Sequence, residues 1–181
     1  MANTGKTVKK KSLPPWLMIV GFLFVFFAAL VSRSVYRAKE CARMADCISN
    51  VMRINSACSQ YAQNFGGVFP PKLSLVYPDY VSSLDIFICP SRKPAVTESD
   101  VLNNFTICYE YVSGLTKQDN QECLLIYDRE KNHRIGDHEG DRNVAFVGGR
   151  VQMIKKENWS SVWQNHEKGL LKRDLLDNRR K

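Results

Sequence analysis

The sequence predicts an α+β protein. One long N-terminal helix, transmembrane in its first part and amphipathic in its second, is expected to pack on a small antiparallel sheet, followed by a short C-terminal helix. No residue from Ser12 to Ser32 is charged, apolar residues recur at helical spacing between Ile48 and Tyr61, and strand-like runs follow after residue 104. The expected parts are a basic cytoplasmic segment 1–13, a transmembrane helix 14–33, its continuation 34–65, a globular domain 66–167 and a charged, mobile tail 168–181.

Residues 16–31 are apolar throughout apart from Gly21. At about 1.5 Å of rise per residue, the uncharged run matches a hydrocarbon layer of roughly 30 Å, so a lipid bilayer is the first expected partner. We interpret the run as an uncleaved single-pass anchor, because residues 28–33 offer only a poor site of the small-residue type that ends a signal peptide.

The orientation of the anchor is expected to place the N-terminus in the cytoplasm and the domain outside a bacterial inner membrane. Basic residues flank the run almost equally on both sides, so the positive-inside rule alone does not decide. The segment before the helix is too short to hold a domain, and the residues after it carry six cysteines, which suits an oxidising periplasm.

The formal charge of +8 does not indicate a nucleic-acid partner. The basic excess lies in residues 1–11 and 168–181, and residues 12–167 hold as many acids as bases. A basic groove interleaved with aromatic residues is therefore not expected on the folded part.

The long helix is predicted to run to about Gln63, because no Gly or Pro interrupts residues 33–65 and "NFGGVFPP" follows. Three or four strands are expected from "FTICYEYVS" (105–113), "ECLLIYD" (122–128) and the hairpin "NVAFVGGRVQMI" (143–154). Gly148 and Gly149 are expected to supply the positive φ of a two-residue turn. Trp159 and Trp163 would then share one packing face of a short helix.

Three of the cysteines, Cys41, Cys47 and Cys58, share the predicted helix, where rises of roughly 9 and 16 Å keep them from pairing with one another. Cys108 and Cys123 lie on consecutive predicted strands and are expected to form a disulfide.

Cys89 could meet either Cys47 or Cys58, and the latter could equally be a small buried apolar residue. A zinc site is not expected, because no CxxC pair occurs and His133, His138 and His166 are scattered relative to the cysteines.

The stretch "DHEGDRN" places oxygen ligands at alternating positions, as a calcium loop does; they are Asp137, Glu139, Asp141 and Asn143. Because Arg142 stands at the sixth position and no glutamate closes the loop, the favoured interpretation is a solvated polar loop. No other cofactor is expected. His138 near Asp128 is interpreted as a structural hydrogen-bonding residue, and no serine or cysteine lies in a nucleophile motif, so an enzyme is not expected.

Three segments together resemble one known family: "ARMADCISNVMRINSACSQYAQNFGGVFPP" (42–71), "FICPS" (87–91) and "LLIYDREKNHRIGDHEGDRNVAFVGGRV" (124–151). They are similar to bacterial type IV pilin-like proteins, also described as type II secretion pseudopilin-like, in the subgroup with a C-terminal His-x9-Asp-Gly signature. The matching residues are Cys47, Asn50, Pro70, Pro71, Cys89, Pro90, Asp128, His138, Asn143 and Gly149.

The resemblance implies a pilin-like fold and a non-enzymatic structural subunit whose partners are other pilin-like subunits or proteins of the secretion apparatus. The alternative is a membrane-tethered periplasmic binding module that keeps the fold outside any filament. Two residues depart from the family: Gly148 replaces the aspartate of the signature, and Phe26 stands where the family leader has glutamate after its Gly-Phe cleavage site, here Gly21-Phe22.

Overall fold

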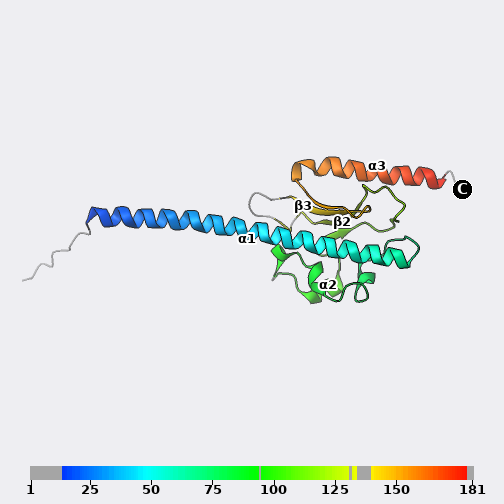
Figure 1. Ribbon diagram of the computed structural model, residues 1–181, viewed down its shortest axis with the longest axis horizontal. Helices are drawn as coiled ribbons and strands as arrows, with labels where there is room; N and C mark the ends of the chain where they lie inside the picture. Colours follow the sequence, from blue (N-terminus) through cyan, green and yellow to red (C-terminus); the bar gives the residue numbers. More distant parts are fainter. Residues whose placement is uncertain (1–13, 94, 131, 134–139, 179–181) are drawn as a thin grey trace, which may run out of the picture. The chain divides into compact units, whose positions relative to one another are not determined.

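The computed structural model describes residues 14–93, 95–130, 132–133 and 140–178 (Figure 1). The chain separates into two compact units, Met1–Lys39 and Glu40–Lys181, each treated by itself. The elements are α1 (Pro15–Asn64), α2 (Glu98–Asn103), β1 (Tyr109–Tyr111), β2 (Leu124–Asp128), β3 (Arg142–Phe146), β4 (Val151–Ile154) and α3 (Trp159–Asn178). The strands form one antiparallel sheet in the order β1-β2-β3-β4, so the predicted mixture of helices with a small antiparallel sheet is confirmed.

The first unit contains the apolar part of α1. This helix is long and apolar enough to cross a membrane by length and composition, and none of its most apolar window is buried. Phe22 and Phe24 expose 72% and 73% of their surface, and neighbouring apolar residues are similarly exposed. The unit is therefore a candidate membrane span.

The C-terminal end of α1 lies where the sequence places it. The helix ends at Asn64, and Gly66 and Gly67 both adopt positive φ. The backbone N–H of Gly67 donates to the carbonyl of Ala62 at 2.7 Å, a bond that satisfies a terminal carbonyl of the helix.

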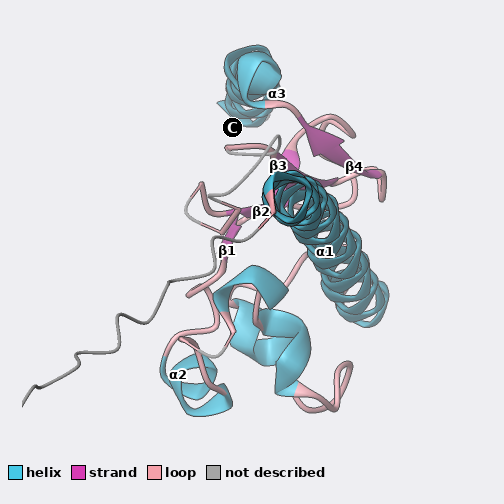
Figure 2. Ribbon diagram, turned by 90° about the vertical axis from the view of Figure 1, so that its left-hand side faces the viewer, coloured by secondary structure: helices cyan, strands magenta, loops and turns pink. Residues whose placement is uncertain are grey.

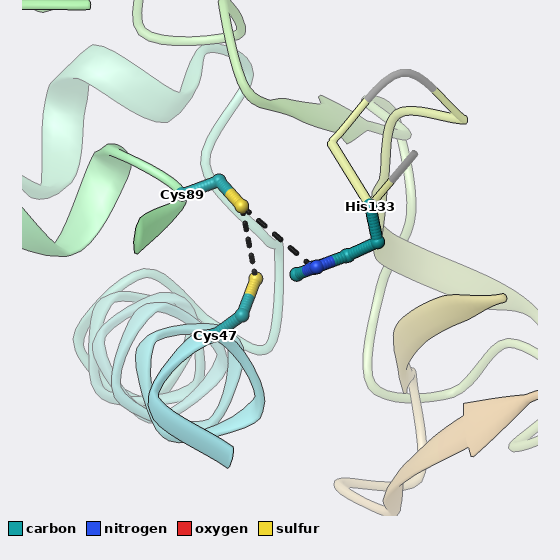
Figure 3. A group of neighbouring side chains, drawn as sticks. All are labelled: Cys47, Cys89 and His133. Carbon is teal, nitrogen blue, oxygen red and sulfur yellow. Dashed lines mark hydrogen bonds between the residues drawn. The ribbon is translucent and has the colours of Figure 1, made fainter. Parts of the chain in front are cut away.

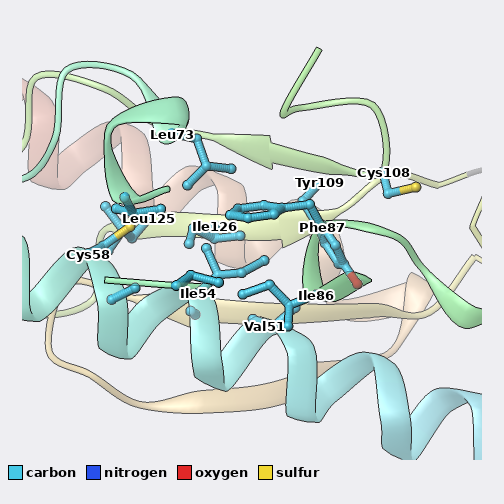
Figure 4. Close-up of a cluster of buried hydrophobic side chains, with 14 of the residues drawn as sticks. Val51, Ile54, Cys58, Leu73, Ile86, Phe87, Cys108, Tyr109, Leu125 and Ile126 are labelled. Carbon is cyan, nitrogen blue, oxygen red and sulfur yellow. The ribbon is translucent and has the colours of Figure 1, made fainter. Parts of the chain in front are cut away.

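In the second unit, one face of α1 packs against one face of the sheet (Figures 2 and 4). The buried α1 residues recur every three or four positions and are Cys47, Val51, Ile54, Ala57, Cys58 and Ala62. Leu125, Ile126 and Ala145 contribute the sheet side of this core. Segment 69–101, which includes the first part of α2, packs on the same cluster through Phe69, Phe87 and other apolar side chains.

The opposite face of the sheet is covered by α3. Leu124, Val144, Phe146 and Ile154 form a second apolar cluster with Trp159, Val162 and Trp163. The expectation that the two tryptophans pack on one helix face is confirmed. The expected tail is corrected, because α3 continues to Asn178 and Leu170 packs against the main core.

A bulge in β2 sets which of its side chains face α1. Leu124 pairs with Phe146 and Ile126 with Ala145, so Leu125 is one extra residue on β2. Leu125 and Ile126 consequently both join the α1 core, whereas Tyr127 packs with α3. Strict alternation from Leu124 would have directed Asp128 toward α3, and the bulge directs it toward α1 instead.

The β3–β4 turn differs from the two-residue turn that was expected. Residues 147–150 connect the strands, and of the two glycines only Gly149 has a positive φ, of 85°. Gly148 serves a different purpose, since a Cβ there would lie 3.1 Å from both Cβ and the backbone oxygen of Gln121. An aspartate at this position would require Gln121 to move by a few tenths of an ångström.

Gly169 allows α3 to approach the sheet closely, because an added Cβ would lie 2.5 Å from Cys123 Sγ. Alanine normally favours a helix over glycine by about 1 kcal/mol. We nevertheless expect Gly169→Ala to lower the free energy of unfolding by about 1–3 kcal/mol through overpacking. Denaturant unfolding of the full chain in detergent measures this, and Cys123→Ala should restore the loss. A stabilising Gly169→Ala would contradict the close approach.

The buried ring of His166 predicts a loss of stability in mild acid. The Leu124 N–H donates to His166 Nδ1 at 3.2 Å, and burial lowers the pKa of the ring. Protons then bind the unfolded chain more readily, so the free energy of unfolding should fall as the pH drops below the ordinary histidine value of about 6.5.

The matched variant for this prediction is His166→Asn, whose side-chain oxygen can still accept the Leu124 N–H. Unfolding free energies measured from neutral to mildly acidic pH should fall more steeply in the parent than in the variant, since His133 is present in both. Equal slopes would show that His166 does not titrate on unfolding.

Candidate functional site

Four side chains from separate segments meet inside the second unit. They are Cys47 on α1, Cys89 just before the short helical turn Pro90–Arg92, Asp128 at the end of β2 and His133 in the following loop. All four are buried, with exposures of 0–1%. We call these four residues the buried polar cluster, and three of them are drawn in Figure 3.

The polar atoms of the buried polar cluster form a closed ring of short contacts. Cys47 Sγ lies 3.8 Å from Cys89 Sγ, which lies 3.7 Å from His133 Nε2 (Figure 3). His133 Nε2 lies 3.5 Å from Asp128 Oδ2, and Asp128 Oδ1 lies 3.2 Å from Cys47 Sγ. The two sulfurs and one ring nitrogen of His133 all lie within 4.8 Å of one another.

Two further hydrogen bonds hold the Asp128 carboxylate, one from a backbone N–H and one from a side-chain amide. The backbone N–H of Asn143 donates to Asp128 Oδ2 at 3.1 Å, and Asn132 Nδ2 donates to Oδ1 at 3.3 Å. Tyr109 OH lies 3.4 Å from Cys47 Sγ on the β1 side. A buried carboxylate needs such partners, because an unpaired one would be strongly destabilising.

The outer side of His133 faces a second carboxylate. His133 Nδ1 lies 3.4 Å from Glu40 Oε1 and 3.2 Å from Ser91 Oγ. The Ser91 hydroxyl donates to the same Glu40 oxygen at 3.0 Å, and Arg43 pairs with the other oxygen at 3.2 Å. The two ring nitrogens of His133 therefore have distinct surroundings, with Nε2 toward the sulfurs and Nδ1 toward Glu40.

The pKa values of the two thiols are shifted in opposite directions. The hydrogen bond with Cys89, burial and the Asp128 carboxylate raise the pKa of Cys47, while the same hydrogen bond lowers the pKa of Cys89. Burial opposes a charge on His133, but its contacts with Asp128 and Cys89 prevail and raise its pKa to about 10. The arrangement favours a thiolate at Cys89 beside an imidazolium.

The chemistry open to this arrangement is limited by burial. Reactive cysteines of enzymes lie where a substrate can reach them, whereas the sulfurs of Cys47 and Cys89 are fully buried. Two thiols, an imidazole and a carboxylate are a donor set for a thiophilic metal ion, and the two thiols are also close enough to approach disulfide formation after a small shift.

The structure can be compared with the cysteine pairings expected from the sequence. Cys89 lies beside Cys47, one of its two expected neighbours, and no disulfide joins Cys47, Cys58, Cys89, Cys108 or Cys123. The predicted bridge between Cys108 and Cys123 does not fit the structure. Arg129 N donates to the carbonyl of Cys108, which therefore lies six residues along the sheet from Cys123, or about 20 Å in a strand.

The expectation that the histidines are scattered is wrong for His133, which lies in the buried polar cluster. Sequence reasoning instead placed His138 near Asp128, and His138 lies outside the described residues. No motif marks His133, because it belongs to an irregular loop, so only the structure could find it. Glu40 was missed for the same reason, since nothing in a helical pattern singles out one glutamate.

Two of the four possible calcium ligands lie in the described part of the chain, and two lie outside it. Asp137 and Glu139 lie outside the described residues. Asp141 is buried and accepts a hydrogen bond from the backbone N–H of Lys156 at 3.0 Å. Asn143 is buried in β3, where its backbone N–H donates a hydrogen bond to Asp128.

Several residues that carry the family resemblance converge on this region. Cys47, Cys89 and Asp128 belong to the buried polar cluster, and Asn143 donates to it. Asn50 Nδ2 donates to the carbonyl of Ile88 at 3.2 Å, one turn along α1. Pro70 accepts a hydrogen bond from Tyr111 OH. The resemblance therefore marks residues that tie α1 to segment 69–101 and the sheet.

Comparison of the chain with family models, with curated proteins and with solved structures finds no match.

The pairing of Glu40 with His133 and Ser91 predicts a measurable loss of stability on truncation. Glu40→Ala leaves the Ser91 hydroxyl and His133 Nδ1 without their carboxylate, which should cost about 1–3 kcal/mol of unfolding free energy. Denaturant titration of the full chain in detergent provides the measurement. Asp46→Ala is the matched control, because Asp46 is an exposed carboxylate on the same helix; equal effects of the two variants would contradict the role of Glu40.

Proposed function

We propose that this chain is a non-enzymatic structural subunit of the bacterial inner membrane, a divergent or minor pseudopilin-like component of a type II secretion or type IV pilus-like apparatus. The observation that carries the proposal is the double nature of α1. The helix has an exposed apolar stretch of membrane-spanning length, and its later residues form one side of the core of an α+β domain. The residues that resemble pilin-like proteins support the same proposal.

Exposure of the apolar stretch supports a membrane location. Trp16, Phe24 and Phe27 expose 60%, 73% and 67% of their surface, and the side chains between them are comparably exposed. Burying one such side chain is worth about 1.5–3 kcal/mol. A continuous stripe of them therefore requires a covering medium, and a bilayer matches the length of the stretch.

The proposed orientation keeps the basic residues before α1 in the cytoplasm and the domain in the periplasm. Lys9–Lys11 precede the span, but Arg33, Arg37 and Lys39 follow it, so the basic residues alone do not decide the side. The cysteines no longer add support, because Cys47, Cys58, Cys89, Cys108 and Cys123 form no disulfide.

A tethered binding module is the second candidate function. The observation that favours it is the leader, where Phe26 occupies the position of the family glutamate that is thought to pair with a neighbouring subunit. Under this alternative, the same anchor and domain act as a monomer.

Membrane anchoring is tested by alkaline extraction of membranes from cells expressing the full chain. We expect the parent protein to stay in the membrane pellet. Phe24→Arg with Phe27→Arg should move it to the soluble fraction, because an arginine near the centre of a span costs about 2.5–3.5 kcal/mol. The control, Phe24→Leu with Phe27→Leu, should remain in the pellet. A parent protein that is extracted as readily as the arginine variant would refute the anchor.

Subunit packing separates the two candidate functions. Single cysteines introduced at successive positions from 24 to 40 and oxidised in the membrane should give crosslinked pairs with helical periodicity if the chain assembles in a stack. A mature N-terminus at Phe22 carrying an N-methyl group would add support for filament entry. Absence of crosslinks at every position would favour the tethered module.

A further inference from the structure

The donor atoms of the buried polar cluster lie next to one another, and those of Cys47, Cys89 and His133 all lie within 4.8 Å of one another. Cys47 and Cys89 each offer a sulfur, His133 offers Nε2, and Asp128 offers a carboxylate oxygen. They come from α1, from the turn before Pro90, from the end of β2 and from the loop after it. Because no two of them are neighbours in the chain, no short sequence motif announces them.

The four contacts around the cluster match four of the six edges of a zinc tetrahedron. Zinc binds sulfur at about 2.3 Å and nitrogen or oxygen at about 2.0–2.2 Å, which gives ligand–ligand edges of about 3.8 Å for two sulfurs and about 3.3–3.6 Å for the other pairs. The structure has 3.8 Å between the sulfurs and 3.7 Å from Cys89 Sγ to His133 Nε2. Asp128 Oδ2 lies 3.5 Å from His133 Nε2 and 3.5 Å from Cys47 Sγ. The sulfur of Cys47 and a ring nitrogen of His133 lie within 4.8 Å of each other.

The surroundings of the ligands fit the same geometry. Histidines that bind a metal through one nitrogen usually donate the other N–H to a carboxylate, which fixes the ring. His133 points Nε2 at the sulfurs and Nδ1 at Glu40, which is itself held by Ser91 and Arg43. Asp128 is oriented by the Asn143 N–H and by Asn132.

We infer that Cys47, Cys89, His133 and Asp128 bind one Zn²⁺ ion as a closed structural site. The thiolates select a thiophilic metal over Ca²⁺ or Mg²⁺, and a closed site of two sulfurs, a ring nitrogen and a carboxylate oxygen suits zinc. Four protein ligands leave no open coordination position, so the ion links α1 to segment 69–101 and to β2 rather than performing chemistry. Binding releases to solvent the protons that the thiols and the His133 ring carry beforehand.

The alternative to zinc binding is a disulfide between Cys47 and Cys89. It would shorten their separation from 3.8 Å to about 2.05 Å, and it would remove the thiol that faces Asp128. Zinc instead uses all four donor atoms near their present positions.

The test is the zinc content of the full chain, purified in detergent without chelator and measured by elemental mass spectrometry. We expect about one zinc ion per chain, as a single closed site requires. Cys47→Ser and Cys89→Ser should each abolish it. Cys41→Ser and Cys58→Ser are the matched controls, because these cysteines lie on the same helix outside the cluster. Zinc that is retained by Cys89→Ser, or absent from reduced protein supplied with Zn²⁺, would overturn the inference.

Two further measurements guard against variants that fail to fold. Cobalt added to the parent protein after chelation should give the near-ultraviolet absorption of thiolate–cobalt bonds, and Glu40→Gln should weaken zinc affinity about 10–100-fold while leaving the ligands in place. Peptide mass spectrometry of the parent protein, unfolded and alkylated without reduction, should find Cys47 and Cys89 as separate alkylated thiols. A peptide pair joined by a Cys47–Cys89 disulfide would establish the alternative and refute zinc binding.

Discussion

The buried carboxylate of Asp128 constrains the whole second unit. An ionised carboxylate without partners is too costly to bury, and Asp128 is 0% exposed. Its partners come from three directions: Cys47 on α1, the backbone of Asn143 on β3 and Asn132 in the loop after β2. A shift of α1 along the sheet by one turn would remove the Cys47 thiol from the carboxylate. The register of the long helix on the sheet is therefore fixed at one polar point.

The arrangement of β2 allows Asp128 to reach this contact with α1. The bulge at Leu125 turns Asp128 toward α1, while the apolar residues before it fill the α1 core and Tyr127 joins the α3 cluster. The sheet is thereby covered on both faces, with apolar packing along most of α1 and polar contacts near Cys47. The helix that we propose to span the membrane is thus held to its domain by two kinds of interaction, one broad and one specific.

Local patterns were enough to predict some of these features. The apolar run, the end of α1 at the Gly66–Gly67 pair and the positions of the strands all depend on neighbouring residues, and the structure contains each. Features that depend on residues far apart in the sequence could not be predicted. The register of β1 on β2 separates Cys108 from Cys123, and a single extra residue reverses the direction of Asp128. His133 and Glu40 meet only because the fold brings a loop to a helix, which no spacing in the sequence encodes.

The most direct measurement is a double-mutant cycle between Cys47 and Asp128. Unfolding free energies of the full chain in detergent are compared for Cys47→Ala, Asp128→Asn and the double variant. A coupling free energy of about 1–3 kcal/mol is expected, because the two side chains share one buried contact across α1 and β2. Additive effects, with a coupling indistinguishable from zero, would show that Asp128 does not fix the position of the helix.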